Sequence, residues 1–309
     1  MERIMINEEQ VRKSLEDVLV PAVKRSIVGM NLVSEITCSN GKVNITLAST
    51  GLIPGSQKWI KAKVEEAVES IPEVKKVNVE YVDIKAKDLN EIDHIVAVMS
   101  GKGGVGKSLV SSLIAIALKR QGNEVGILDA DIYGPSQPQM LGLTGERPTS
   151  EDGETMAPLI GHGLQVMSIG FLVDPDQPMI WRGPMVTSAL NQLMNQTLWH
   201  ELDYLIVDMP PGTGDVQLTL SQQVPVSGAV IVTTPQNIAT LDARKGLAMF
   251  QKVKIPVLGV IENMCTHICS SCGHEEAIFG SGGAEQMVAD FDIPLLGQLP
   301  LDARIREQT

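Results

Sequence analysis

The sequence predicts an α/β protein in which a mainly parallel sheet is covered by helices on both faces, preceded by a small α/β domain. Three observations lead to this prediction. From residue 95 onward, short apolar runs alternate with segments of helical periodicity, as in parallel strands joined by helices. A glycine-rich stretch at 101–106 stands between an apolar run and such a segment. A highly charged stretch without an apolar stripe, 83–93, separates two patterned regions.

The small domain is placed at residues 1–85 and a linker at 86–94. Asn40-Gly41 is a typical hairpin dipeptide between two apolar-rich runs. A later segment repeats apolar residues at helical spacing, and an alternating run follows it. We therefore expect a helix, a hairpin, a second helix and a last strand, at residues 8–19, 32–38 with 42–48, 55–70 and 74–82.

The larger domain is placed at residues 95–309. Its predicted strands are the apolar runs at 95–98, 124–128, 164–169, 204–207, 229–232 and 257–261. Helices are expected between them, including one at 185–198. Ligands of parallel sheets bind beyond the carboxyl ends of the strands, so the residues that follow each run are candidate site residues.

The glycine-rich stretch completes the pattern G-x-x-x-x-G-K-[ST] between a strand and a helix. Glycines let successive backbone N–H groups turn toward phosphate oxygens, and the helix N-terminus adds positive charge. Lys107 is placed to reach the β- and γ-phosphates, and the Ser108 hydroxyl to hold Mg²⁺. The predicted ATP-binding residues of this loop are Gly101, Lys102, Gly103, Gly104, Val105, Gly106, Lys107 and Ser108.

A second lysine in this loop, Lys102, carries a resemblance. The form K-G-G-x-G-K-[ST] resembles the deviant Walker A loop of the P-loop NTPases of the MinD/ParA/nitrogenase-iron-protein group. The resemblance implies that Lys102 reaches the nucleotide of a partner chain and serves catalysis together with Lys107. We therefore expect an ATP-clamped homodimer.

Carboxylates follow two further strands. Asp129 and Asp131 come after the run 124–128, where paired carboxylates can hold Mg²⁺ or orient a water molecule. The resemblance implies that Asp131 positions the attacking water and that Asp129 lies nearer the metal, whereas a capping aspartate in a turn is the alternative for Asp131. Asp208 ends an apolar run as in a Walker B motif and is expected to hold Mg²⁺. The loop after it resembles switch II, in which the Gly212 N–H senses the γ-phosphate.

Two further candidate residues remain, of which only the first follows from this resemblance. Asn263 matches the position at which this group recognises the adenine edge. Arg182 stands in the stretch 178–184, where an arginine that contacts phosphate or the partner chain and a purely structural arginine both stay open.

Three cysteines lie within eight positions, Cys265, Cys269 and Cys272. The C-x-x-C pair brings two thiolates within reach of one metal centre. Three kinds of site are open: an iron–sulfur cluster completed by two thiolates of a second chain, a zinc knuckle that adds Cys265 or a histidine, and a redox-active dithiol. Cys38 lies in a strand pattern and is expected to be a small buried hydrophobe.

Together these motifs resemble the Mrp/ApbC family of iron–sulfur cluster carrier ATPases. The resemblance covers 95–309 and rests on the motifs at 101–108, 129–136, 181–184, 208–215 and on the C-x-x-C pair. It implies an ATP hydrolase in which Cys269 and Cys272 of two chains hold a labile [4Fe–4S] cluster. Apo iron–sulfur proteins would receive the cluster, and scaffold or donor proteins would supply it.

The resemblance has departures as well. Family members usually carry a small polar residue where Cys265 stands, and they run on for several tens of residues, so a domain that continues beyond Thr309 is expected. The N-terminal part looks like the small domain of iron–sulfur assembly factors. The loop at 50–56 lacks the cysteine that such domains often carry, so we assign this domain no chemistry of its own.

The composition narrows the partners and the location. A net charge of −12 argues against a nucleic-acid or anionic-membrane surface as the main partner, and 3% aromatic residues leave few platforms for base stacking. No run reaches the roughly 18 apolar residues of a membrane span. The N-terminus lacks a signal-peptide pattern and the cysteines lack a disulfide pattern, so a cytoplasmic location is expected. The rival functions are a MinD/ParA-like positioning ATPase with a structural zinc site, and a nitrogenase-like reductase.

Overall fold

The computed structural model describes residues 7–21, 26–28, 32–39, 41–49, 52, 54–72, 74–82, 89–150, 153–172 and 183–307. The chain divides into two compact units. The first holds residues 1–87 together with 148–160 and 196–200, and the second holds the remainder. Within the described residues, no helix has the length and apolar character needed to cross a membrane.

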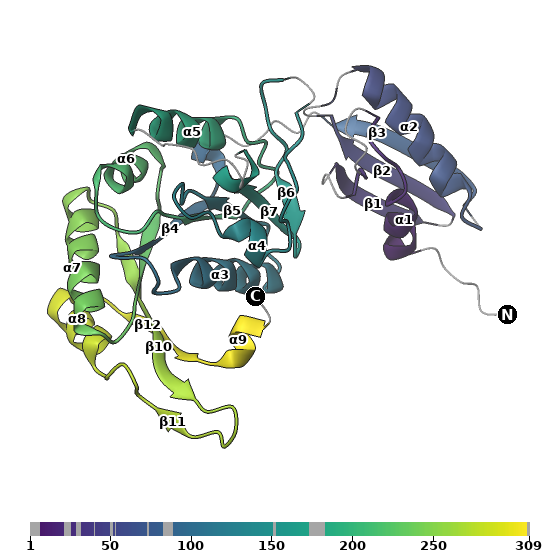
Figure 1. Ribbon diagram of the computed structural model, residues 1–309. Coiled ribbons are helices and arrows are strands. Elements are labelled where there is room, and N and C mark those ends of the chain that lie inside the picture. Colours follow the sequence, from purple (N-terminus) through teal and green to yellow (C-terminus); the bar gives the residue numbers. More distant parts are fainter. Residues whose placement is uncertain are drawn as a thin grey trace. The chain divides into compact units, whose positions relative to one another are not determined.

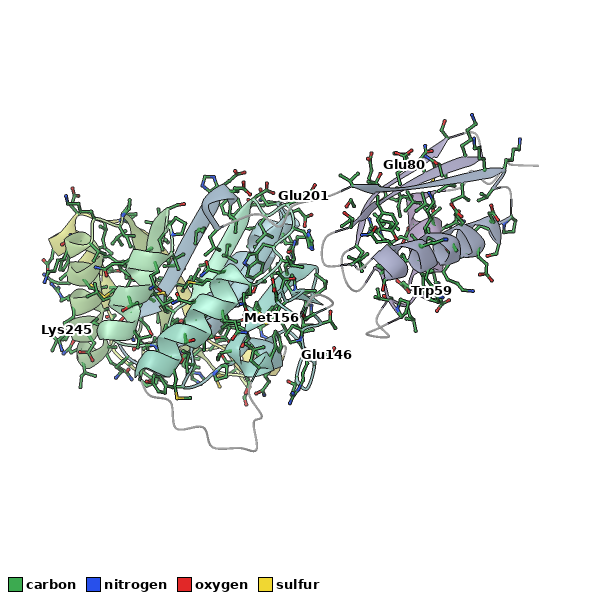
Figure 2. All side chains as sticks on the ribbon, turned by 90° about the horizontal axis from the view of Figure 1, so that it is seen from above. Trp59, Glu80, Glu146, Met156, Glu201 and Lys245 are labelled. Atoms are coloured by element: carbon green, nitrogen blue, oxygen red, sulfur yellow. The ribbon has the colours of Figure 1, made fainter. Side chains whose placement is uncertain are left out.

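The described residues of the N-terminal unit form a three-stranded sheet and two helices (Figure 1). Its elements are α1 (Glu8–Leu15), β1 (Val33–Ser39), β2 (Lys42–Ala48), α2 (Pro54–Glu69) and β3 (Lys76–Val82). β2 pairs antiparallel with β1 and parallel with β3. α2 buries Ile60, Val64 and Val68 completely, because residues at this spacing share one helix face. Its outer face carries Trp59, which is 42% exposed (Figure 2).

Helix α1 is shorter than the predicted helix at 8–19 and ends at Leu15. Beyond it the chain turns, and the Val18 carbonyl accepts a hydrogen bond from the Ile27 N–H at 2.9 Å. Val18 and Val20 are nevertheless buried. Apolar residues that looked like a continuing helical face therefore reach the same core from a turn.

A nine-stranded sheet within the described residues has the order β11-β10-β9-β4-β8-β5-β7-β6, with β12 beside β10. All of its strands except β6 lie wholly in the second unit. The strands from β10 to β7 in this order run parallel. In Figure 1, α3 lies on one side of these strands and α5 and α6 on the other, so the predicted fold class is confirmed. The elements are η1 (Leu89–Glu91), β4 (His94–Ser100), α3 (Lys107–Arg120), β5 (Val125–Asp129), α4 (Gln137–Met140), β6 (Leu159–Gly161), β7 (Leu164–Ser168), η2 (Ile169–Phe171), α5 (Gly183–Asn195), β8 (Tyr204–Asp208), α6 (Asp215–Gln223), β9 (Gly228–Thr233), α7 (Asn237–Lys252), β10 (Val257–Ile268), β11 (Glu275–Glu276), α8 (Gly283–Phe291), β12 (Leu295–Leu301) and α9 (Ala303–Glu307).

Strand β10 differs most from its prediction, because it continues past Ile261 to Ile268. Glu262 and Asn263 interrupt the apolar pattern, yet both are buried. The Glu262 carboxylate accepts hydrogen bonds from the Ala284 N–H at 3.1 Å and the Gln298 amide at 2.8 Å. A buried polar side chain with internal partners keeps the strand intact.

The sheet register brings the candidate residues to one edge. Asp208 of β8 pairs with Val98 of β4 on one side and with Asp129 of β5 on the other. The three strands are parallel, so the loops that follow them all leave from the same edge. The glycine-rich loop and both carboxylate segments therefore meet there.

Candidate functional site

The glycine-rich loop joins β4 to α3 and has no room for side chains at two points. A Cβ atom at Gly101 would lie 2.2 Å from the carbonyl carbon of Asp242 in α7. Gly106, directly before α3, has φ +84°, and a Cβ atom there would lie 2.1 Å from Nδ2 of Asn263. Glycine is thus required at these positions by the close approach of α7 and β10.

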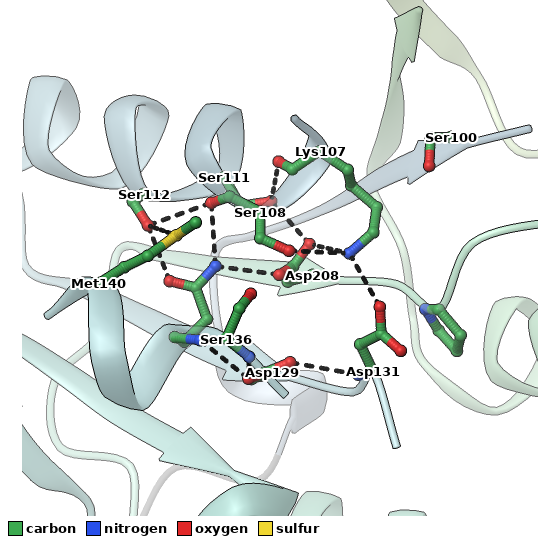
Figure 3. Close-up of polar contacts among 12 residues, drawn as sticks. Ser100, Lys107, Ser108, Ser111, Ser112, Asp129, Asp131, Ser136, Met140 and Asp208 are labelled. Carbon is green, nitrogen blue, oxygen red and sulfur yellow. Dashed lines mark hydrogen bonds and ion pairs between the residues drawn. The ribbon is translucent and has the colours of Figure 1, made fainter. Parts of the chain in front are cut away.

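The side-chain nitrogen of Lys107 lies between the carboxylates of Asp208 and Asp131 (Figure 3). This Nζ atom donates a hydrogen bond to Oδ1 of Asp208 at 2.5 Å and another to Oγ of Ser108 at 3.2 Å. Oδ2 of Asp131 is 3.7 Å from the same nitrogen. The fold thus brings together the lysine, the serine and two of the carboxylates that the sequence marked as site residues.

Gln137 of α4 is a site residue that the sequence pattern missed. Its Nε2 atom donates to Oδ2 of Asp208 at 2.9 Å and to the Ser108 carbonyl at 3.0 Å, and its Oε1 accepts from Ser112 Oγ at 2.7 Å. Ser111 also donates to Asp208, at 3.0 Å. The only available signal was the position of Gln137 in the loop after a strand end.

Asp129 is fully buried and holds the loop that leads to α4. Its Oδ1 accepts from the Asp131 N–H at 3.2 Å, while Oδ2 accepts from the N–H groups of Ser136 and Gln137, each at 3.1 Å, and from Ser168 Oγ at 2.9 Å. These bonds fix the path of the chain between β5 and α4. The predicted place of Asp129 near the metal stays a prediction.

The carboxylates of this site carry more negative charge than Lys107 can balance. Burial raises the pKa of Asp129 to about 7, and the nearby Asp208 carboxylate acts in the same direction. Burial is also the main cause that raises the pKa of Asp131, although the Lys107 ammonium opposes it. A divalent cation would relieve this repulsion, and the hydroxyl and carboxylate oxygens present are ligands that Mg²⁺ accepts.

Two predicted nucleotide contacts have protein partners in this structure. Asn263 is 3% exposed, and its Nδ2 atom donates to the Val105 carbonyl of the glycine-rich loop at 2.9 Å. The Gly212 N–H donates to the Ser100 carbonyl at 2.9 Å. Adenine recognition by Asn263 and phosphate sensing by Gly212 stay predictions. Lys102 lies partly exposed in the loop, and Arg182 falls outside the described residues.

The C-x-x-C pair lies at the tip of the β10–β11 hairpin, which projects from the sheet in Figure 1. The Cys269 N–H donates to the His274 carbonyl at 3.0 Å, and the Gly273 N–H donates to the Cys269 carbonyl at 2.8 Å. The N–H groups of Ser271 and Cys272 and the Cys272 thiol lower the pKa of Cys269. The two thiols therefore lie side by side, Cys272 exposed and Cys269 partly so.

The other candidate ligands do not join this pair. Among the described residues, no group of three or more His, Cys, Asp and Glu side chains has the geometry of a metal site. Sγ of Cys265 instead lies 3.9 Å from Thr266 Oγ1. Cys38, in β1, is partly buried, and burial raises the pKa of its thiol.

Comparison with known families matches both parts of the chain. Residues 91–309 match the family of the NUBPL iron-transfer P-loop NTPase, and residues 8–81 match that of the iron-sulfur cluster assembly protein. The iron-sulfur cluster carrier protein of Haemophilus influenzae is 49% identical over 97% of this chain and 83% of its own length. That of Escherichia coli is 59% identical over 71% of this chain, which spans only 59% of that relative's length.

Solved structures support the same fold. A nucleotide-binding protein from Archaeoglobus fulgidus in complex with ADP is 37% identical, with a TM-score of 0.63 over 73% of this chain and 90% of its own. The cell division ATPase MinD of Pyrococcus furiosus is 22% identical, with a TM-score of 0.50 over 71% of this chain and 87% of its own. The second likeness bears on the fold alone.

Proposed function

This chain belongs to the family of iron–sulfur cluster carrier P-loop NTPases, and from that premise we propose that it holds a labile [4Fe–4S] cluster between two copies of itself and uses ATP hydrolysis to pass the cluster to apo-proteins. The observation that carries the proposal is a solvent-accessible thiol pair at the tip of the β10–β11 hairpin, in the same sheet that forms the P-loop site at β4, β8 and β5. Each chain offers two thiols, and four cysteines complete the ligand shell of such a cluster.

The nucleotide site supplies the ATPase chemistry. The loop N–H groups would bind the phosphates, and Lys107 would exchange its bond to Asp208 for the β- and γ-phosphate oxygens. Ser108 and Asp208 would hold Mg²⁺, which neutralises charge on the phosphates. Asp131 would orient the attacking water, because its carboxylate already lies beside Lys107. Lys102 would reach the nucleotide of the second copy.

The cysteine pair suits a cargo that must leave. Iron binds the thiolate form, and the lowered pKa of Cys269 increases the fraction of thiolate near neutral pH. Exposure of the tip leaves room for the thiols of a second copy and, later, for those of a recipient protein. A buried site would bind the cluster without letting it go.

Apolar side chains at the nucleotide edge support a second copy there. Tyr133, in the loop after β5, is 69% exposed, and Ile238 and Leu241 in the first turns of α7 are 62% and 56% exposed. α7 follows β9, the neighbour of the P-loop strand β4. Large apolar side chains exposed just beyond the carboxyl ends of these strands favour a protein interface at this edge.

The remaining parts of the proposal concern organisation and partners. A small domain at 1–85, a linker at 86–94 and an ATPase domain at 95–309 are proposed, in the cytoplasm. Scaffold or donor proteins would supply the cluster and apo iron–sulfur proteins would accept it. The family match of residues 8–81 supports a role for the small domain in cluster assembly.

The test is transfer of a reconstituted cluster to an apo-enzyme that regains activity with it. Wild type with Mg²⁺ and ATP should restore that activity. Lys107→Ala should keep the cluster and lose ATP-dependent transfer by roughly 100-fold or more, since a P-loop lysine is removed. The matched control is Lys119→Ala, on the same helix but paired with Glu124 at the surface. Transfer by Lys107→Ala at the wild-type rate would refute the coupling to ATP, and tightly bound zinc in place of a cluster would refute the carrier function.

A further inference from the structure

One strand physically joins the nucleotide site to the thiol pair. β10 carries Asn263 against the glycine-rich loop and, six positions later, leads into Cys269 at the hairpin tip. The Asn263 amide donates a hydrogen bond of ordinary length, 2.9 Å, to the Val105 carbonyl. A Cβ atom at Gly106 would overlap the same side chain. The glycine-rich loop and β10 are therefore in direct contact through the Asn263 side chain.

The segment between these two residues is irregular. Asn263 pairs with Leu299 of β12, and the next pair is His267 with Leu301. Four steps along β10 thus match two steps along β12, which is a bulge with two additional residues. Met264 lies in it with φ +56°, a left-handed conformation that is uncommon for a residue other than glycine.

The two sides of this bulge are held differently. On the P-loop side, Glu262 is 1% exposed and bonded to both α8 and β12. On the hairpin side, Glu275 and Glu276 of β11 are exposed, and only two residue pairs join β11 to β10. The bulge therefore separates a fixed strand from a hairpin that few bonds restrain.

We infer that Asn263 is a positioning residue that couples the state of the P-loop to the geometry of the Cys269–Cys272 pair, with the Met264 bulge as the hinge. Phosphate binding shifts the glycine-rich loop at Val105, and the hydrogen bond from Asn263 transmits this shift to β10. The hairpin then rotates about the bulge. The inference rests on the proposed function only in that it takes this thiol pair as the one that binds the cluster. It adds a role for Asn263 that base recognition does not require.

The experiment measures how fast iodoacetamide alkylates Cys269 and Cys272, resolved by peptide mass spectrometry, in the metal-free full chain. Rates are compared without nucleotide, with Mg-ADP and with a non-hydrolysable Mg-ATP analogue, each above its dissociation constant for the variant in use. In wild type the nucleotide should change the Cys269 rate by roughly two- to tenfold, the range that one hydrogen bond can transmit. An unchanged rate in wild type would overturn the inference.

Two variants and a control locate the coupling. Asn263→Ala removes the bond to the loop and should abolish the nucleotide effect at saturation. Met264→Gly keeps that bond but relaxes the bulge, and it should reduce the effect. Asn123→Ala is the matched control, because Asn123 makes the same kind of amide-to-carbonyl bond, to Leu118 at 3.0 Å, at the other end of α3. It should retain the full effect.

The outcomes separate this inference from the proposed function. A full nucleotide effect in saturated Asn263→Ala would overturn the coupling through Asn263, and a full effect in Met264→Gly would overturn the hinge. Reconstitution with iron and sulfide, run on the same preparations, tests the cluster independently. A chain that binds the cluster but shows no nucleotide effect on alkylation refutes the coupling alone. A chain that shows the nucleotide effect but binds no cluster refutes the carrier function alone.

Discussion

Gln137 offers a sharp test of how the site is held together, because its side chain connects three elements. Gln137→Ala would leave Asp208 Oδ2, the Ser108 carbonyl and Ser112 Oγ each without one partner. A bond to a charged group contributes about 1.5–3 kcal/mol and a neutral one about 0.5–1.5 kcal/mol. Ser112 Oγ keeps a second acceptor, the Ser108 carbonyl at 3.1 Å. The expected loss in free energy of unfolding is therefore about 3 kcal/mol.

The assay is denaturant and thermal unfolding of the full chain with chelator and without nucleotide. For a unit of this size, a loss of about 3 kcal/mol lowers the melting temperature by roughly 6–12 °C. The matched control is Gln139→Ala, on the same short helix but exposed, which should shift the melting temperature by less than about 2 °C. A shift for Gln137→Ala no larger than that of the control would refute the three-way connection.

Three further perturbations have definite expected outcomes. The pKa of Asp129 is raised to about 7 from an ordinary 3.8, so its contribution to the free energy of unfolding is complete below about pH 4 and is lost as pH rises toward 7. This contribution is at most about 4 kcal/mol. Asp129→Asn should therefore weaken the pH dependence of the free energy of unfolding between pH 5 and 8, and an equally steep dependence in that variant would contradict this origin. Gly101→Ala should abolish nucleotide binding in calorimetry, because its Cβ would overlap the backbone of α7. Gly103→Ala, whose Cβ would have nothing within 4 Å, should fold and melt as wild type does. Equal nucleotide binding and equal melting temperatures in the two variants would contradict the close approach of α7. Ile238→Glu should prevent nucleotide-dependent dimerisation in sedimentation, while Trp59→Glu, a large exposed apolar side chain on the N-terminal unit, should not. A dimer that survives Ile238→Glu would place the interface elsewhere.

The fold class and the family could be predicted because their signals are local. The glycine pattern at 101–108 needs only its own spacing and its flanking strand and helix, and Asp208 is recognised by the apolar run that it ends. The family match confirms the predicted P-loop ATPase class. These features are contiguous in the chain, so their meaning does not depend on tertiary contacts.

The parts that were not predicted depend on contacts between distant segments. Gln137 reaches Asp208 across 71 residues, and Asn263 reaches Val105 across 158. In the sequence, the charged Glu262 looks like the end of an apolar strand. Strand β10 nevertheless continues through it, because groups of α8 and β12 donate hydrogen bonds to its carboxylate. β12 escaped prediction because a glycine and a proline interrupt its apolar residues.

The most direct test of the account is native mass spectrometry of the anaerobically reconstituted chain with Mg²⁺ and a non-hydrolysable ATP analogue. The central claim is that two chains share one cluster through Cys269 and Cys272. The account predicts a species of two chains with one four-iron cluster, absent from the Cys269→Ala/Cys272→Ala variant. A complete cluster or a zinc ion on each single chain would contradict the claim.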